Sequence, residues 1–267
     1  MKNKRITFLG GGNMAEAILS GMLTGDLVLA NNIVVADISA ERRAWLQTEY
    51  GVDVTPDNAA AVGGADIVVL AVKPQQAAAV LAGVRDAFSD RQILISICAG
   101  LTTAALEVQT PARVARVMPN LPALISCGVA AICGGSRVTT ADLDLVERIF
   151  AATGVVVRVP EQKMNEVTAL SGSGPGYVFA FIEALEAAGI GMGLAADTAR
   201  TMAIETVRGA AEMAAQTSAD PAELRRRVSS KGGTTLAGLA AMEAGGFSAA
   251  VAAGMAAARD RADELAR

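Results

Sequence analysis

Apolar and polar positions alternate along the first 160 residues in blocks that predict strands separated by helices. Short apolar runs bounded by Gly, Pro, Asp or Asn are typical of buried strands, and the longer stretches between them read as helical. This alternation predicts right-handed βαβ units in a mainly parallel sheet with helices on both faces. The expected strands are 6–9, 33–36, 66–72, 93–98, 114–117, 128–132 and 155–159, and the expected helices are 13–24, 40–49, 75–87, 102–108 and 140–152.

After Pro160 the pattern changes, because strand-like runs give way to helical stretches rich in Ala, Met and Gly. Several of these helices are apolar on more than one face and need a second burial partner, which a homodimer would supply. We therefore expect an α/β fold with a doubly wound, Rossmann-type sheet over 1–160 and an all-α dimerisation domain over 161–267. The helices expected there are 161–191, 195–217, 221–228, 235–244 and 248–266, with Asp220-Pro221 as a cap and a first-turn proline.

The first expected strand runs directly into Gly10-Gly11-Gly12-Asn13-Met14-Ala15, which opens the first expected helix. Read as Gly10-x-Gly12-x-x-Ala15, this segment has the pattern and the position of a dinucleotide fingerprint. Gly10 permits the tight turn, Gly12 lets the backbone approach a pyrophosphate, and the free N–H groups at the helix start face the phosphates. An ordinary strand–turn–helix junction is the alternative interpretation.

An acid at the end of the second expected strand, Asp37, completes the fingerprint. A carboxylate there normally accepts the ribose hydroxyls of NAD and repels the 2′-phosphate of NADP. Arg42 and Arg43 lie one turn further on, where they either counter that charge or form a solvated helix face. The sequence therefore predicts a nicotinamide dinucleotide and leaves its 2′ position open.

Further cofactor contacts are expected where other strands end, because ligands of such sheets lie beyond the carboxyl ends of the strands. The candidates are Ala71-Val72-Lys73-Pro74 after one strand and Cys98-Ala99-Gly100 after the next. Lys73 is a cofactor candidate here, although a lysine is more often a surface charge.

Composition limits the chemistry. The 267 residues carry a net charge of −4 without a basic block, which argues against nucleic acid as a partner. The chain has no apolar run of membrane-span length and no signal-peptide core, so we expect a cytoplasmic protein without a membrane partner. Three cysteines without a Cys-x-x-Cys make a disulfide framework unlikely. The absence of histidine excludes Ser–His–Asp and Cys–His machinery and His-ligated zinc, and no metal site is predicted.

Three further segments, 116–123, 170–179 and 228–239, add a recognisable pattern. With the Gly10–Ala15 loop and residues 71–74, they resemble pyrroline-5-carboxylate reductases, in the same order and over essentially the whole chain. The most specific of them is Ser229-Ser230-Lys231-Gly232-Gly233-Thr234-Thr235. The resemblance implies an NAD(P)H-dependent oxidoreductase that transfers hydride to the C=N bond of 1-pyrroline-5-carboxylate. The product would be L-proline, in the last step of proline synthesis.

The substrate is a small anion with a cationic imine, and the residues of the Gly-Gly segment are suited to bind it. A Gly-Gly turn before a helix offers backbone N–H groups and the positive helix end to a carboxylate. We expect Ser230, Gly233, Thr234 and Thr235 to bind substrate, with Ser230 and Thr235 as catalytic residues and the Thr235 hydroxyl near the ring nitrogen. A plain helix–loop–helix turn with a Thr cap is the alternative.

Other positions follow from the resemblance alone. It implies that the break Ser171-Gly172-Ser173-Gly174-Pro175 faces the nicotinamide, although a kink for close helix crossing explains the same residues. It also implies cofactor contacts at Asn58 and Ala99, a substrate contact at Glu161, and a cleft lined by Met118-Pro119-Asn120. The implied cofactor is NADP(H). NAD(H) is possible because Asp37-Ile38 stands where many members carry Asn-Arg. The expected cofactor-binding residues are Gly10, Gly11, Gly12, Asn13, Met14, Asp37, Asn58, Ala71, Val72, Lys73, Pro74, Cys98, Ala99, Ser173, Gly174 and Pro175.

Two other functions remain open at this point. A 3-hydroxyacid or ketopantoate-type dehydrogenase would share the plan but usually needs a helix-borne lysine for its alcohol. The helical half offers only Lys163 and Lys231, and a protonated imine needs no such group. A nucleotide-binding protein without turnover is the third possibility. For the reductase, the resemblance implies a homodimer or a larger assembly of dimers, with the Ser230–Thr235 loop of one chain facing the nicotinamide of the other.

Overall fold

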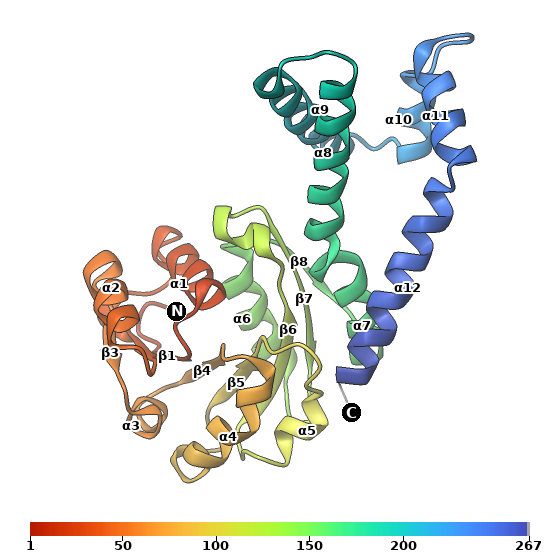
Figure 1. Cartoon of the computed structure of the whole chain (residues 1–267). Coiled ribbons are helices and arrows are strands. Elements are labelled where there is room, and N and C mark those ends of the chain that lie inside the picture. The colour runs from red at the N-terminus through yellow and green to blue at the C-terminus, as the bar shows by residue number, and fades with distance from the viewer. Residues whose placement is uncertain (266–267) are drawn as a thin grey trace. The chain divides into compact units, whose positions relative to one another are not determined.

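The computed structural model describes residues 1–265. By their mutual contacts these residues form two units (Figure 1). The sheet unit comprises Met1–Ser173 together with residues 258–265, and the helical unit comprises Gly174–Ala257. The sequence places the boundary at residue 160, where the last strand has just ended; the contacts group the next dozen residues with the sheet.

One eight-stranded sheet organises the sheet unit, in the order β3-β2-β1-β4-β5-β6-β7-β8. All neighbouring strands are parallel except β6 and β7, so the expected mainly parallel sheet is confirmed. From β1 the chain adds β2 and β3 on one side of the sheet, and β4 then starts the other side. Ligands of doubly wound sheets bind at this switch point between β1 and β4. The strands are β1 Ile6–Leu9, β2 Ile33–Ala36, β3 Asp53–Thr55, β4 Ile67–Leu70, β5 Ile93–Ser96, β6 Arg113–Met118, β7 Gly128–Gly134 and β8 Gly154–Arg158.

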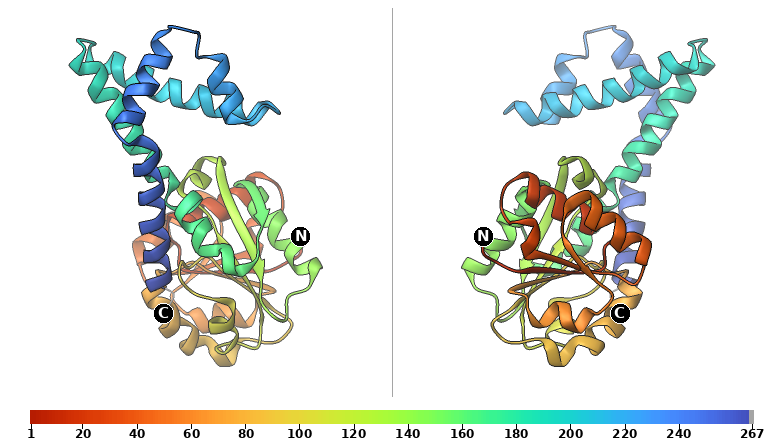
Figure 2. Two further views of the ribbon diagram at one scale, coloured as in Figure 1. Left: turned by 90° about the vertical axis from the view of Figure 1, so that its right-hand side faces the viewer. Right: turned by 90° about the vertical axis from the view of Figure 1, so that its left-hand side faces the viewer.

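Helices cover both faces of this sheet (Figures 1 and 2). Successive strand residues point to opposite faces, so Phe8 joins the core under α1, α2 and α6, whereas Leu9 joins the core under α3, α4 and α5. Both side chains are fully buried. The helices are α1 Asn13–Thr24, α2 Ala40–Tyr50, α3 Asn58–Gly63, α4 Pro74–Val84, α5 Thr103–Glu107, α6 Thr140–Ala151 and α7 Met164–Val167.

One strand and one α-helix of the sheet unit are absent from the expected set, β3 and α3. β3 has three residues, only one of them apolar, so it lacks the continuous run that marks a buried strand. α3 has six residues, too few for a helical period, and it depends on Asp57, whose carboxylate accepts from the N–H groups of Ala59 and Ala60. The expected helix 161–191 is also divided, by a π turn over Thr168–Gly172.

The helical unit contains helices only. Gly189 of α8 lies against Ala199 of α9, and Phe181 and Phe247 pack with ring centroids 6.3 Å apart. Asp220 caps α10 through the Glu223 N–H, as expected. No single helix over residues 1–265 is long and apolar enough to cross a membrane; α11 with α12, as a bent pair, meets that test by length and composition. The helices are α8 Gly174–Gly191, α9 Ala196–Gln216, α10 Pro221–Arg227, α11 Thr234–Ala244 and α12 Phe247–Leu265, of which residues 258–265 group with the sheet unit. Residue 266 of the last expected helix lies outside the described residues.

Candidate active site

A cleft of about 630 Å³ lies at the carboxyl ends of β1, β2 and β4 in the sheet unit. It brings together a large part of the expected cofactor set: Gly10, Gly12, Asp37, Asn58, Ala71, Val72 and Lys73. Sequence reasoning missed the remaining wall, which consists of Ala36, Ile38, Gln75, Gln76, Ala79 and Val80. Four of these residues belong to α4: Gln75, Gln76, Ala79 and Val80. They are three or four positions apart, so they lie on one face of the helix, and this spacing was the sequence signal that could have identified them.

The glycine loop leaves room above the first turn of α1. Gly10 has φ +97°, and a Cβ there would lie 2.8 Å from the Ala71 carbonyl oxygen, so only glycine is accommodated. A Cβ on Gly12 would meet nothing within 4 Å. Gly12 caps α1 without a side-chain hydrogen bond, which leaves the first-turn N–H groups available to an anion. This open cradle fits the pyrophosphate of a dinucleotide.

Asp37 closes one side of that loop. Its Oδ2 accepts a hydrogen bond from the Gly11 N–H at 2.7 Å, and its Oδ1 accepts one from the Ser39 N–H at 2.8 Å. Because a carboxylate offers about four acceptor positions, capacity for ribose hydroxyls remains. Asp37 therefore fits the role that the fingerprint assigns to it.

Other expected cofactor residues lie outside the cleft lining. Asn13 and Met14 form the first turn of α1, Pro74 is the first residue of α4, and Ala99 follows β5. Cys98 is buried, and its thiol donates to the Val72 carbonyl oxygen at 3.3 Å. Burial raises the pKa of Cys98 to about 11, so this thiol stays protonated at neutral pH.

Glu161, the expected substrate contact, belongs to a buried network in the sheet unit. Its carboxylate accepts from the N–H and the hydroxyl of Thr103, both at 2.6 Å. Its Oε1 lies 3.6 Å from Nη1 of Arg116, a side chain of β6 that is only 3% exposed. Burial and the nearby Glu161 raise the pKa of Cys133 to about 11. The network was not foreseen, because its members are far apart in sequence.

The glycine-rich break before α8 is confirmed as a π turn followed directly by Ser173 and then by Gly174 and Pro175 in the first turn of α8. The Asn120 amide donates to the Ser171 carbonyl oxygen at 3.1 Å, and its Oδ1 accepts from the Val129 N–H at 2.8 Å. Asn120 therefore holds the π turn against the sheet. Such turns are frequent at functional sites.

In the helical unit, the expected carboxylate loop is a glycine turn that begins a helix. Gly232 has φ +72°, and the Gly233 N–H donates to the Ser230 carbonyl oxygen at 2.9 Å. Gly233 caps α11 without a side-chain hydrogen bond, so the first-turn N–H groups, including those of Thr234 and Thr235, are available to an anion. Nearby Arg227 is paired with Glu223 of its own helix at 3.1 Å.

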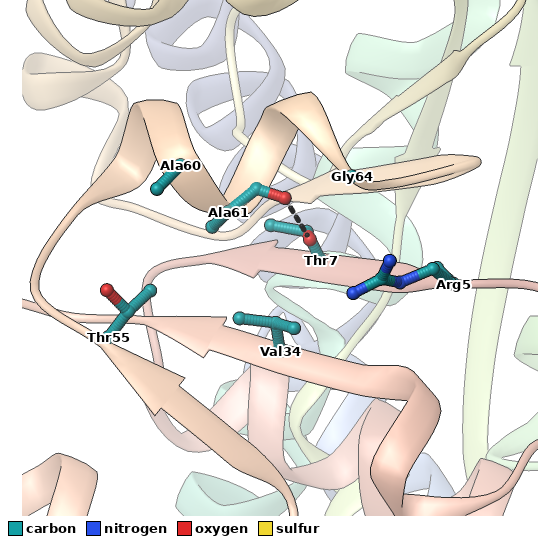
Figure 3. Close-up of a pocket in the computed structure, with 7 residues that line it drawn as sticks. All are labelled: Arg5, Thr7, Val34, Thr55, Ala60, Ala61 and Gly64. Atoms are coloured by element: carbon teal, nitrogen blue, oxygen red, sulfur yellow. Dashed lines mark hydrogen bonds between the residues drawn. The ribbon is translucent and has the colours of Figure 1, made fainter.

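A second cavity, of about 190 Å³, lies beneath α3 (Figure 3). The Thr7 hydroxyl donates to the Ala61 carbonyl oxygen at 2.8 Å across it. Arg5 is its one charged lining residue, and none of the expected site residues lines it. We assign no chemistry to this cavity.

The doubly wound sheet and its open glycine cradle define a dinucleotide-dependent oxidoreductase. Residues 5–100 match the family described as NADP oxidoreductase coenzyme F420-dependent, and residues 161–265 match pyrroline-5-carboxylate reductase dimerisation. The chain is 40% identical to a pyrroline-5-carboxylate reductase of Pseudomonas aeruginosa over 100% of this chain and 98% of the other. A reductase of that name from Methanosarcina acetivorans is 38% identical over 99% of both chains.

Solved structures agree with this result. A pyrroline-5-carboxylate reductase from Coxiella burnetii superposes with a TM-score of 0.94 at 36% identity, and both chains are fully covered. The Plasmodium falciparum pyrroline carboxylate reductase with NADP bound superposes with a TM-score of 0.90 at 29% identity, again with full coverage.

The chain belongs to the pyrroline-5-carboxylate reductase family. These matches confirm the predicted fold class, the reductase function and the use of NAD(P)H, and they do not favour a hydroxyacid dehydrogenase. The dimerisation match implies a homo-oligomer that acts on a small molecule.

Proposed function

We propose that this chain reduces the C=N bond of 1-pyrroline-5-carboxylate to L-proline with the two glycine turns in complementary roles. The turn at Gly10–Gly12 holds the dinucleotide, and the turn at Gly232–Gly233 holds the substrate. The bound nicotinamide supplies the hydride. The observation that carries the proposal is that both turns open a helix without a side-chain cap, which leaves two anion sites in one chain.

In the substrate site, the carboxylate of 1-pyrroline-5-carboxylate would accept from the first-turn N–H groups of α11. The Ser230 hydroxyl lies directly beside Gly233, where a Cβ has no room, and it is well placed to add a further donor. The positive end of an 11-residue helix favours the anion. This arrangement orients the ring and leaves the imine carbon open to hydride.

The chemistry at nitrogen is simple, because the imine is already protonated in its reactive form. Hydride adds to the imine carbon, the C=N π electrons become the nitrogen lone pair, and the nitrogen keeps its proton. We assign to Thr235 the task of hydrogen bonding to that nitrogen. Neither buried thiol supplies a proton acceptor, since the pKa values of Cys98 and Cys133 lie near 11. The absence of histidine from the chain is consistent with this scheme.

The homo-oligomer is proposed to be a dimer, or an assembly of dimers, in which each site uses both chains. Large apolar side chains of the helical unit are exposed in the single chain, with Met192 79% exposed and Phe179 55%. Large apolar side chains that are exposed to this extent in one helical unit indicate an interface of the obligate type. We also propose a functional boundary at residue 160, and the start of the dimerisation-family match at residue 161 supports it. A cytoplasmic location, without nucleic acid or membrane partners, stays a prediction.

The deciding experiment follows the loss of NAD(P)H absorbance with three substrates in parallel. They are 1-pyrroline-5-carboxylate, the ketoacid that corresponds to a 3-hydroxyacid, and ketopantoate. Oxidation with 1-pyrroline-5-carboxylate and product analysis showing L-proline are expected. Turnover with the ketoacids alone contradicts the proposal. Dinucleotide binding without turnover of any substrate identifies a binding protein instead.

A further inference from the structure

We infer that this chain selects NADH over NADPH, through Asp37 and Ile38 at the edge of the cleft. The inference rests on the proposed function and deepens it. Its starting point is the wall of the cleft after β2, where Ala36, Asp37 and Ile38 are all lining residues. In dinucleotide-binding sheets the residues after this strand contact the adenosine ribose.

The Asp37 carboxylate has a fixed position. One oxygen accepts from the Gly11 N–H and the other from the Ser39 N–H, and Gly11 is itself part of the phosphate loop. The carboxylate therefore cannot turn away from a ligand without losing its hydrogen bond to the phosphate loop. Its remaining acceptor positions suit two ribose hydroxyls, which are donors. A 2′-phosphate offers negative charge instead and would be repelled at the same place.

Arg42, in the first turn of α2, is committed to other partners. Its guanidinium forms an ion pair with Glu16 of α1, and its Nε donates to the Gly11 carbonyl oxygen. The guanidinium carbon also lies 4.6 Å from the centre of the Trp45 ring, within cation–π range. Glu16 is held from a second side by the Tyr50 hydroxyl at 3.0 Å. Moving Arg42 to a phosphate would leave Glu16 and the Gly11 carbonyl without this partner.

Arg43 is committed as well, because its Nη1 donates to the Asp37 carbonyl oxygen at 2.6 Å. Neither arginine lines the cleft. The side chain that does extend there is Ile38, which is 87% exposed and has no hydrogen-bond donor to offer a phosphate. An exposed isoleucine on a cleft wall provides an apolar surface for the adenine ring.

One cation lines the described cleft, Lys73. It follows β4, whereas Asp37 follows β2, and β1 lies between these strands. With about 4.8 Å between neighbouring strands, the two strand ends are separated by about 10 Å. Lys73 is therefore suited to the pyrophosphate or the nicotinamide half, which NADH and NADPH share, and does not discriminate between them.

The experiment measures binding rather than turnover. Titration calorimetry on the cofactor-free protein compares NADH with NADPH, and ADP-ribose with its 2′-phosphorylated form. We expect the forms without the 2′-phosphate to bind at least about tenfold more tightly, with the ratio falling as salt is raised. The double variant Asp37→Asn/Ile38→Arg should reverse the order. Ile38→Gln, which adds no charge, is the matched control and should preserve the order.

Two results overturn the inference. If wild-type protein binds NADPH as tightly as NADH, or more tightly, the preference is refuted while the reductase function stands. If it binds neither dinucleotide, the proposed function fails together with the preference. Thermal stabilisation by each ligand gives a second readout for the variants and shows directly that they are folded.

Discussion

The carboxylate of Glu161 lies 3.6 Å from the guanidinium of Arg116 and also accepts two hydrogen bonds from Thr103. This cluster joins three segments that are distant in sequence: β6, the start of α5 and the residues after β8. Arg116 is almost completely buried, and its Nη2 has no hydrogen-bond partner among residues 1–265. The ion pair with Glu161 is therefore the main interaction that compensates the buried positive charge of Arg116.

We predict that removing the acid of this pair destabilises the protein more than removing the arginine does. Glu161→Gln leaves a buried cation without its counter-charge, so the free energy of unfolding should fall by about 3 kcal/mol. Arg116→Met should cost less, because Glu161 keeps the two Thr103 donors. Denaturant unfolding at one protein concentration measures both, and the double variant supplies the coupling energy. Additive effects of the two single substitutions would show that the residues do not interact.

A second prediction concerns the phosphate loop. Gly12→Val should abolish dinucleotide binding while the fold survives, because a Cβ at this position meets no protein atom within 4 Å and the side chain would occupy the open space above α1. Calorimetric titration of NAD(P)H checks the binding, and circular dichroism checks the fold. Gly83→Val of α4, where a Cβ also meets nothing within 4 Å, is the matched control. Unchanged affinity in folded Gly12→Val would contradict the cofactor assignment.

The sequence predicted the parts of this site that are local. The Gly10–Ala15 loop, Asp37 and the Gly-Gly turn before α11 each depend on a few adjacent residues, and the structure gives them the expected local conformation. The strands were found because runs such as 67–70 are apolar throughout and buried on both faces.

The rest depends on tertiary contacts that no local pattern carries. The pairing of Arg42 with Glu16 spans 26 residues, so Arg42 was interpretable equally as a phosphate ligand or as a solvated charge. Arg116 similarly reads as a polar strand residue until Glu161 is placed beside it. Ile38 and the α4 face enter the cleft because of how β2 and α4 are arranged around β1, which only the fold determines.

The third prediction concerns the three cysteines. Cys98 and Cys133 are buried with pKa values raised to about 11, so both remain protonated thiols well above neutral pH, whereas Cys127 is exposed. A thiol-reactive disulfide reagent at pH 8 should therefore modify one cysteine per chain in the folded protein and three after unfolding. Mass spectrometry of the product identifies the site. Rapid modification of Cys98 in the folded protein would contradict its burial.

A fourth prediction tests the hydroxyl at the substrate site. Thr235→Ala should lower kcat/KM for 1-pyrroline-5-carboxylate by about 10- to 1,000-fold, which is the range for loss of one oriented donor. The affinity for the dinucleotide should barely change, because the Gly10–Gly12 turn is intact. Thr235→Ser keeps the hydroxyl and should retain most of the activity. Wild-type kinetics in Thr235→Ala would remove this residue from the proposed mechanism.

The last prediction is that each active site is completed across a homodimer. If the dinucleotide loop of one chain works with the Ser230–Thr235 loop of its partner, a Gly12→Val chain and a Thr235→Ala chain should rescue each other in part. In such a heterodimer one site would carry both lesions and the other would carry neither. Co-expression with two different affinity tags yields the mixed dimer without relying on slow subunit exchange, and the two homodimers, each with impaired activity, serve as the controls. A purified heterodimer without activity would place both loops in the site of a single chain, and full activity of a monomer in sedimentation at nanomolar concentration would refute the shared site. The exposed apolar residues of the helical unit, such as Phe179 and Met192, favour rescue, because they indicate that the helical unit is buried against a second copy.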